Sequence, residues 1–319
     1  MEKVGIWRVT DQELTRLRPS NIGLEKDLES WIEQDPELLE QGLKIVGRQI
    51  YVEGGYLDLL GINPQGQWVV IELKSQGTDR HTLAQALDYA ACIAALPWET
   101  LRDKIETYLR EDNRSVDELE EAYGTLDEDL DETRDVRIYL VGTGTSPRLE
   151  RMVDFLAGTY DVPITLVSYD VFQIGDGHKV LVRELSEPET SGRETQRSVE
   201  DLCARARQNG IGKDFEEILE AAREHGIYPR AYTQSIMYTP PTNHSRMLFT
   251  VRNWTRADNL LLLYFSAEAF AEFYPVTEEY VRSRFGEDGW RHMTHGEVEE
   301  FIANLDRLFE KVSESENAE

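Results

Sequence analysis

Three charged residues of this sequence lie within apolar runs, where a charge needs a physical explanation. Asp58 is in the middle of the run 56–62, and Glu72 and Lys74 lie two residues apart in the next apolar run. Because strand side chains alternate between two faces, Glu72 and Lys74 are expected to point to the same face. The turn signal Asn63-Pro64-Gln65-Gly66 joins the two runs, so we expect a hairpin in which Asp58 and Glu72 meet.

Two chemistries fit this group of charges. The first is an internal salt bridge between Lys74 and a carboxylate, which is weak evidence for stability because desolvation offsets the attraction. The second is a metal site, because a pair of carboxylates suits an oxygen-preferring ion such as Mg²⁺ or Mn²⁺. A phosphodiester at such an ion is polarised for attack by water, and Lys74 would orient that water or stabilise charge on the phosphate. The spacing alone leaves both interpretations open.

A helix is expected after this hairpin, from His81 to Leu96, because apolar residues recur there at helical spacing. Gln85 and Tyr89 are four residues apart and therefore share one face of that helix. Two interpretations are open for the pair: it lines the mouth of the proposed site, or it belongs to the solvated surface.

Asp58, the run Glu72-Leu73-Lys74 and Gln85 follow one another in an order that resembles the PD-(D/E)xK nuclease superfamily. Within that superfamily the chain is similar to the NucS (EndoMS) type of DNA endonuclease, over roughly residues 22 to 95. The resemblance implies a catalytic group drawn from the sheet and the two neighbouring helices. Its members would be Asp58, Glu72, Lys74, Gln85, Glu25 and Tyr89.

In that family a glutamate on the preceding helix completes the metal site. The pattern favours Glu25, with Glu29 one turn later as the competing choice. The resemblance thus implies Mg²⁺ or Mn²⁺ as cofactor, held by Asp58, Glu72 and one of these two glutamates. Two departures limit the comparison. Leu57 precedes Asp58 where the superfamily often has proline, and an additional domain follows the nuclease-like part instead of preceding it, so mismatch specificity is not carried over.

The expected order of elements is one helix, three strands, then helix, strand, helix and strand. This order predicts an α/β fold with a restriction-endonuclease-like mixed sheet core flanked by helices. We expect the nuclease-like domain over residues 1–186, a polar linker over 187–198, and a smaller α+β C-terminal domain over 199–319. Near the N-terminus, a strand is expected over 4–9 and the start of a helix over 11–14.

The predicted C-terminal domain contains a stretch of 32 residues, 226–257, that has no acidic residue. Aromatic residues are interleaved with its four arginines, and arginines hold phosphates while aromatic faces stack on unpaired bases. One interpretation is therefore contact with DNA, and the alternative is a core strand whose arginines pair with acids elsewhere in the domain. The four candidates are Arg230, Arg246, Arg252 and Arg256.

The formal net charge of −27 argues at first sight against a nucleic-acid binder. Between Glu111 and Asp135, however, twelve acids stand against two bases, so much of the negative charge lies in one connecting segment. No apolar run approaches the roughly 20 residues of a membrane span, and the first residues do not have the pattern of a signal peptide. We therefore expect a cytoplasmic protein that binds DNA and no membrane.

Cysteine and histidine give no metal signature in this sequence. The two cysteines, Cys92 and Cys203, are expected to be reduced core residues. His292 and His295 are three residues apart, but they have neither cysteine nor HExxH partners, so we expect no metal role for them.

Two functions compete on this basis. The favoured one is a metal-dependent DNA endonuclease that hydrolyses phosphodiester bonds, an activity that would depend on Glu72. The alternative is a catalytically silent nuclease-fold protein that binds DNA or a partner as a regulatory subunit, in which Glu72→Ala would change nothing. Cutting both strands of a duplex takes two active sites, which is compatible with a homodimer. The residues do not distinguish DNA from RNA as substrate.

Overall fold

The computed structural model divides by its contacts into two compact units. It describes residues 5–9, 13–18, 24–74, 80–123, 126, 134–144, 146–160, 162–175, 178–186, 198–232, 235–244, 246–252 and 260–316. Unit 1 consists of Met1–Asn63, Trp68–Leu109 and Thr133–Arg193, and unit 2 of Pro64–Gln67, Arg110–Glu132 and Glu194–Glu319. Apart from Ser198, the predicted linker 187–198 lies outside the described residues.

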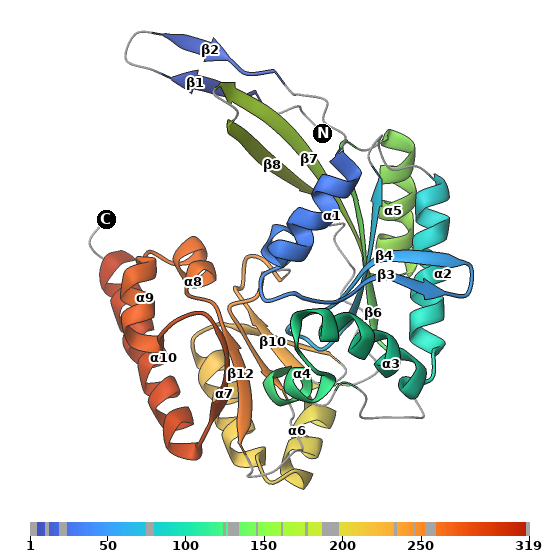
Figure 1. Ribbon diagram of the computed structural model, residues 1–319. Coiled ribbons are helices and arrows are strands. Elements are labelled where there is room, and N and C mark those ends of the chain that lie inside the picture. The colour runs from blue at the N-terminus through green and yellow to red at the C-terminus, as the bar shows by residue number, and fades with distance from the viewer. Residues whose placement is uncertain are drawn as a thin grey trace. The chain divides into compact units, whose positions relative to one another are not determined.

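Unit 1 is built on a six-stranded mixed sheet with the strand order β3-β4-β5-β6-β7-β8 (Figure 1). The first three strands form an antiparallel meander, β6 and β7 continue the sheet parallel to β5, and β8 pairs antiparallel with β7. This confirms the predicted mixed α/β core. The strands are β3 (Lys44–Val52), β4 (Gly55–Ile62), β5 (Trp68–Lys74), β6 (Val136–Gly142), β7 (Ile164–Gly175) and β8 (His178–Ser186).

Helices cover both faces of this sheet. On one face, α1 (Leu24–Gln34) buries Leu28 and Ile32 in a cluster with Leu59, Ile71 and Leu73 from β4 and β5. Burying each of these side chains contributes about 1.5–3 kcal/mol, which fixes α1 against the middle of the sheet. On the opposite face, α2 and α5 lie side by side (Figure 1). The remaining helix bounds in this unit are α2 (Arg80–Ala95), α3 (Trp98–Leu109) and α5 (Pro147–Tyr160).

A two-stranded ribbon, β1 (Trp7–Val9) and β2 (Leu14–Arg16), stands where the sequence predicted a strand followed by the start of a helix. Leu14 pairs with Val9, so the helix prediction is wrong at Leu14, and residues 11 and 12 lie outside the described residues. Strand pairing with β1 satisfies the backbone of this segment, and this short hairpin overrides the helix-start signal.

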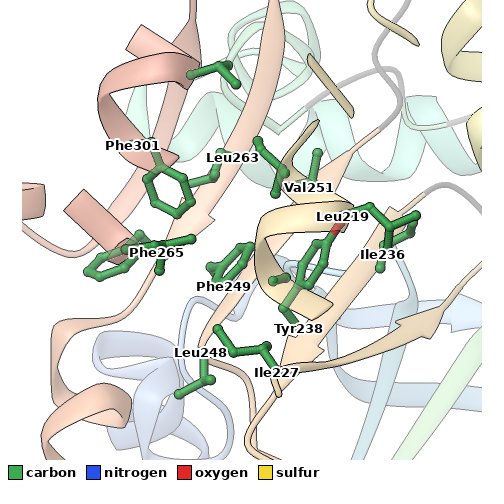
Figure 2. Close-up of a cluster of buried hydrophobic side chains, with 14 of the residues drawn as sticks. Leu219, Ile227, Ile236, Tyr238, Leu248, Phe249, Val251, Leu263, Phe265 and Phe301 are labelled. Atoms are coloured by element: carbon green, nitrogen blue, oxygen red, sulfur yellow. The ribbon is translucent and has the colours of Figure 1, made fainter. Parts of the chain in front are cut away.

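Unit 2 contains a five-stranded antiparallel sheet with the order β13-β12-β11-β10-β9, as the α+β prediction requires. Its core is rich in aromatic rings, and Phe249 stacks on Tyr238 with ring centroids 4.3 Å apart (Figure 2). The strands are β9 (Tyr228–Ala231), β10 (Ser235–Thr239), β11 (Phe249–Arg252), β12 (Leu261–Phe265) and β13 (Gly289–Met293). The helices are α4 (Val116–Tyr123), α6 (Val199–Gln208), α7 (Gly212–Glu224), α8 (Ala267–Phe273), α9 (Glu278–Phe285) and α10 (His295–Glu316).

Candidate active site

The register of the β4–β5 hairpin places Asp58 and Glu72 across from each other. The ladder pairs Leu59 with Ile71, so the next position along each strand brings Asp58 opposite Glu72. Leu59 and Ile71 point into the core beneath α1. Asp58 lies one residue beyond this last ladder pair, and its carboxyl group is bonded to the β5 backbone at Leu73, the residue after Glu72. The predicted hairpin and its register are as expected from the sequence.

Asp58 lies where the backbone pairing of β4 with β5 ends. Its Oδ2 accepts a hydrogen bond from the Leu73 N–H at 2.8 Å, and its Oδ1 accepts one from Gln49 Nε2 at 3.1 Å. Burial raises the pKa of Asp58 above its ordinary value. The hydrogen bonds from Leu73 and Gln49 and the charge of Lys74 work against this rise, while the nearby charge of Glu29 adds to it. The carboxyl group is thus held in place by neighbours that partly compensate for its burial.

Glu72 and Lys74 form the ion pair that the two-residue spacing predicted. The Lys74 Nζ lies 3.1 Å from Glu72 Oε1, and Glu72 is only 1% exposed. A carboxylate buried to this degree requires a cation beside it, and the half-buried ammonium group of Lys74 supplies one. The internal salt bridge considered from the sequence is therefore present, and the charge of Lys74 also acts on a second carboxyl group, that of Asp58.

Gln49 is a site residue that sequence reasoning missed. Its Nε2 donates to Glu29 Oε1 at 3.0 Å as well as to Asp58, so one amide joins a helix carboxylate to a strand carboxylate. Its backbone φ is +49°, a left-handed value that is strained for a residue other than glycine. No sequence pattern marks such a residue, because only the pairing of β3 with β4 places it opposite Asp58.

Glu29 is engaged in structural contacts. Besides Gln49, it accepts a hydrogen bond from Arg48 Nε at 2.9 Å, and Arg48 also pairs with Glu33. Both hydrogen bonds go to Oε1 of Glu29, and Gln49 joins this carboxylate to Asp58, so Glu29 stays the second choice for a metal ligand. The side chain of Glu25, the first choice, lies outside the described residues, although its backbone belongs to α1.

Gln85 and Tyr89 share one face of α2 and are hydrogen-bonded to each other, with Gln85 Nε2 donating to Tyr89 Oη at 2.9 Å. Tyr89 is buried, and its hydroxyl group lies against Gly55, where a Cβ would come within 2.4 Å of it. Gly55 opens β4 three residues before Asp58. The pair therefore contacts the strand that carries Asp58, and glycine is needed at position 55 to admit the tyrosine.

The donor set on this face is chemically suited to a hard divalent cation. Asp58 and Glu72 supply carboxylate oxygens, which Mg²⁺ and Mn²⁺ prefer, and Lys74 supplies a positive charge beside them. The same three groups are those that phosphodiester hydrolysis requires: ligands for an ion, and a cation that stabilises charge on the phosphate.

The arginines proposed for DNA contact in unit 2 have different environments. Arg252 is 3% exposed in the middle strand of the sheet. The prediction that it contacts a DNA phosphate is therefore wrong, because a buried guanidinium cannot reach a DNA backbone. Arg246 pairs with Glu272, and Arg230 donates from Nη1 to the His244 carbonyl at 2.7 Å. Arg256 lies outside the described residues.

Most of the aromatic residues interleaved with these arginines belong to the core. Tyr238 and Phe249 are fully buried, and Tyr232 is nearly so. Tyr228 is 49% exposed and lies against His244 with its ring tilted, the ring centroids being 4.2 Å apart. The described part of the stretch 226–257 is thus largely strand core; among its arginines and aromatic residues, Tyr228 is exposed and Arg230 and Arg246 are partly exposed.

Comparison with known proteins places the same segment in a nuclease family. Residues 24–95 match the family model of the endonuclease NucS C-terminal domain, which confirms the resemblance seen in the motifs. Endonuclease NucS of Methanocaldococcus jannaschii is 31% identical over 67 residues, which are 21% of this chain and 26% of that protein. Endonuclease NucS of Pyrococcus furiosus is 34% identical over 67 residues, 21% of this chain and 25% of the relative. The matched part thus spans about a quarter of the length of these curated relatives.

Two solved structures are also similar. A repair endonuclease from Pyrococcus abyssi aligns over 43% of this chain and 45% of its own, at 21% identity and a TM-score of 0.27. An EndoMS complex with double-stranded DNA aligns over 46% of this chain and 45% of its own, at 23% identity and a TM-score of 0.27. Separately, none of the helices among the described residues combines the length and apolar character that a membrane crossing requires.

Proposed function

We propose that unit 1 is the catalytic part of a metal-dependent DNA endonuclease that hydrolyses phosphodiester bonds. The observation that carries this proposal is the β4–β5 register, which sets Asp58 opposite Glu72 with Lys74 paired to Glu72. These residues lie within the segment that matches the endonuclease NucS C-terminal domain. The match covers 72 of 319 residues (24–95). The activity and substrate proposed for the whole protein are therefore inferred from this segment and its site.

Asp58 and Glu72 would hold a divalent ion, Mg²⁺ or Mn²⁺, with Glu25 of α1 as the third carboxylate. Such an ion supplies Lewis-acid polarisation of the phosphodiester and a lowered pKa for attacking water. The Leu73 N–H and the Gln49 amide fix the orientation of the Asp58 carboxyl group. Lys74 stabilises the negative charge that builds on the phosphate, and its contact with Glu72 keeps the ammonium group at that position.

DNA is the proposed partner, although the chain as a whole is strongly acidic. In unit 2, Arg230 and Arg246 are the accessible arginines of the acid-free stretch, and their role would be to contact phosphates outside the catalytic part. Cutting both strands of a duplex requires two active sites, which a homodimer would provide. Sedimentation of the full chain with and without DNA tests the dimer separately from cleavage.

The full chain is incubated with supercoiled plasmid, branched DNA and mismatched duplex, in Mg²⁺ and separately in Mn²⁺, and the products are separated on gels. Cleavage should require the ion and should fall at least about 100-fold in Glu72→Gln and in Asp58→Asn. Glu99→Gln, at an exposed acid in the first turn of α3, is the matched control and should cut like the parent protein. Cleavage that persists in both site variants would show that these carboxylates are not the catalytic group.

A further inference from the structure

A second group of charged side chains lies in unit 2, between the beginnings of α7 and α10. Asp214 and Glu217 come from the first turns of α7, and His295 is the first residue of α10. The nearest ligand-type atoms of these three side chains all lie within 4.8 Å of one another. A histidine and two carboxylates at this separation are a set that can close around one ion.

The two nitrogens of His295 have different surroundings. Nδ1 is in short contact with Asp214 Oδ1, and Asp214 is buried. Nε2 lies 2.9 Å from Lys213 Nζ, and an ammonium group can only donate a hydrogen bond. These partners imply that Nδ1 carries the proton and donates it to Asp214, while the lone pair of Nε2 points at a cation. A carboxylate on one imidazole nitrogen and a cation on the other is the arrangement found in carboxylate–histidine–metal triads.

The ammonium group of Lys213 shows where a cation is held. Its Nζ is also 3.5 Å from Glu217 Oε1, and Glu299 Oε1 lies 3.3 Å from His295 Nε2. One positive group thus lies between an imidazole nitrogen and the Glu217 carboxylate, and the Glu299 carboxylate lies close to the same nitrogen. The Lys213 side chain is 67% exposed, so it can leave this position at little cost.

The N-terminus of α10 is fixed, which pre-organises His295. Thr294 and Glu297 form reciprocal hydrogen bonds, with the Thr294 N–H donating to Glu297 Oε2 at 2.7 Å. That backbone hydrogen bond also lowers the pKa of Glu297 below its ordinary value. Each helix N-terminus adds about half a positive charge, which opposes a bound cation. The three carboxylates of Asp214, Glu217 and Glu299 more than offset it.

We propose that this cluster is a binding site for a divalent transition-metal ion such as Zn²⁺ or Co²⁺. His295 Nε2 and Glu217 are the ligands, Glu299 lies beside the same nitrogen, Asp214 orients the imidazole from Nδ1, and Lys213 is the competitor that the ion displaces. Mixed imidazole and carboxylate ligands favour these borderline ions over Mg²⁺, which prefers oxygen alone. The ion would join α7 to α10, and this role is independent of the proposed nuclease site.

The test is calorimetric titration of the full chain with Zn²⁺ in excess Mg²⁺, in an Asp58→Asn, Glu72→Gln background that removes the other proposed metal site. One saturable Zn²⁺ site is expected, and Co²⁺ should bind there with the visible spectrum of a low-symmetry complex. His295→Gln and Glu217→Gln should each weaken Zn²⁺ binding at least about 10-fold. Lys213→Gln should tighten it about two- to fivefold, the scale of a surface ion pair.

His225→Gln is the matched control. His225 forms the other histidine–carboxylate pair between these two helices, with its Nε2 2.8 Å from Asp306 Oδ1, and it should leave Zn²⁺ binding unchanged. The proposal is overturned if the parent background shows no saturable site, if His295→Gln binds Zn²⁺ like the parent, or if Lys213→Gln binds it more weakly. His295, Glu217 and Lys213 are at least one-third exposed at their side chains, so these variants are expected to fold.

Discussion

The carboxylates of the proposed nuclease site and the His295 cluster both surround a positive group, but the chain brings them together in different ways. In unit 1, Asp58, Glu72 and Lys74 lie within 17 consecutive residues of one hairpin, and Lys74 contacts Glu72 along a single strand. In unit 2, Lys213 and His295 are 82 residues apart and meet only because α7 packs against α10. A local site is visible in a sequence, and a site assembled by helix packing is not.

The two groups also differ in burial. Glu72 is 1% exposed, whereas the side chain of His295 is 44% exposed. Electrostatic interactions are stronger away from water, so the strand site can act on a reacting phosphate, while the helix site is screened and suits an ion from solution. The predictions below test this contrast, from the largest expected effect to the smallest.

Replacing Lys74 should have the largest effect, because this side chain pairs with buried Glu72 and is also proposed to stabilise charge on the phosphate. Lys74→Ala removes both the cation beside the phosphate and the partner of buried Glu72. We expect DNA cleavage to fall about 100- to 1,000-fold, the cost of losing one preorganised charge-stabilising group. The midpoint of thermal unfolding should also fall, since Glu72 loses a compensating charge. Single-turnover cleavage and calorimetry on the same preparations measure both changes. A variant that cuts at the parent rate would assign Lys74 a purely structural role.

Arg252 and Arg230 should separate stability from DNA contact within unit 2. Arg252 is buried and its guanidinium lies 6.0 Å from the centre of the Trp290 ring, so Arg252→Ala should cost about 2–3 kcal/mol of stability. Urea denaturation measures this loss.

Arg230→Ala should leave stability nearly unchanged and reduce the slope of DNA affinity against salt by about one charge. Gel-shift titrations at several salt concentrations provide that slope, and an equal slope in Arg230→Ala and the parent would remove Arg230 from the DNA surface.

Two substitutions of Gln49 separate the cost of its strained backbone from the loss of its side-chain hydrogen bonds. Gln49→Ala and Gln49→Gly both lose the hydrogen bonds to Asp58 and Glu29, but glycine adopts the observed φ of +49° without strain. The glycine variant should therefore be about 1 kcal/mol more stable than the alanine variant. Denaturant midpoints of the two variants give this difference. Equal midpoints would mean that the backbone at this position relaxes when the side chain is removed.

The smallest expected effect is a gain in stability when Asp58 is neutralised. Burial raises the pKa of Asp58, so the folded state disfavours its carboxylate form. The contribution of the Asp58 carboxyl group to stability is complete below the ordinary aspartate pKa of about 4 and is lost as pH rises through the folded value. Asp58→Asn loses one of the two hydrogen bonds that the carboxyl group accepts at every pH, so any advantage of the variant in unfolding temperature should be larger at neutral pH than below about pH 4. Calorimetric scans across this range would contradict the assignment if the advantage were the same at every pH.

Much of the unit 1 site could be predicted because it depends on residues that lie close together in the sequence. The apolar runs, the turn 63–66 and the period of two were enough to place Asp58 opposite Glu72 and Lys74 beside Glu72. The predicted helix 81–96 is α2, shifted by one residue at each end. Gln49 was not found, because its left-handed backbone follows from the pairing of β3 with β4.

Composition was less informative in unit 2. An acid-free stretch with arginines and aromatic residues predicts a nucleic-acid surface as readily as a buried strand, and only the packing shows that Arg252, Tyr238 and Phe249 are interior. The spacing of His292 and His295 gave no reason to expect a metal, because Asp214 and Lys213, which contact the two ring nitrogens of His295, lie on a helix far away in the sequence.

The sequence by itself determined the mixed α/β class, the β4–β5 hairpin and the alternation that puts Glu72 and Lys74 on one face, because these depend on neighbours within a few residues. Only the tertiary structure decided which charges are buried, which arginines remain accessible and which histidine meets two carboxylates. Those outcomes depend on contacts between distant segments, and hydrophobic packing of helices and strands, which selects those contacts, is insensitive to the identity of the polar residues it brings together.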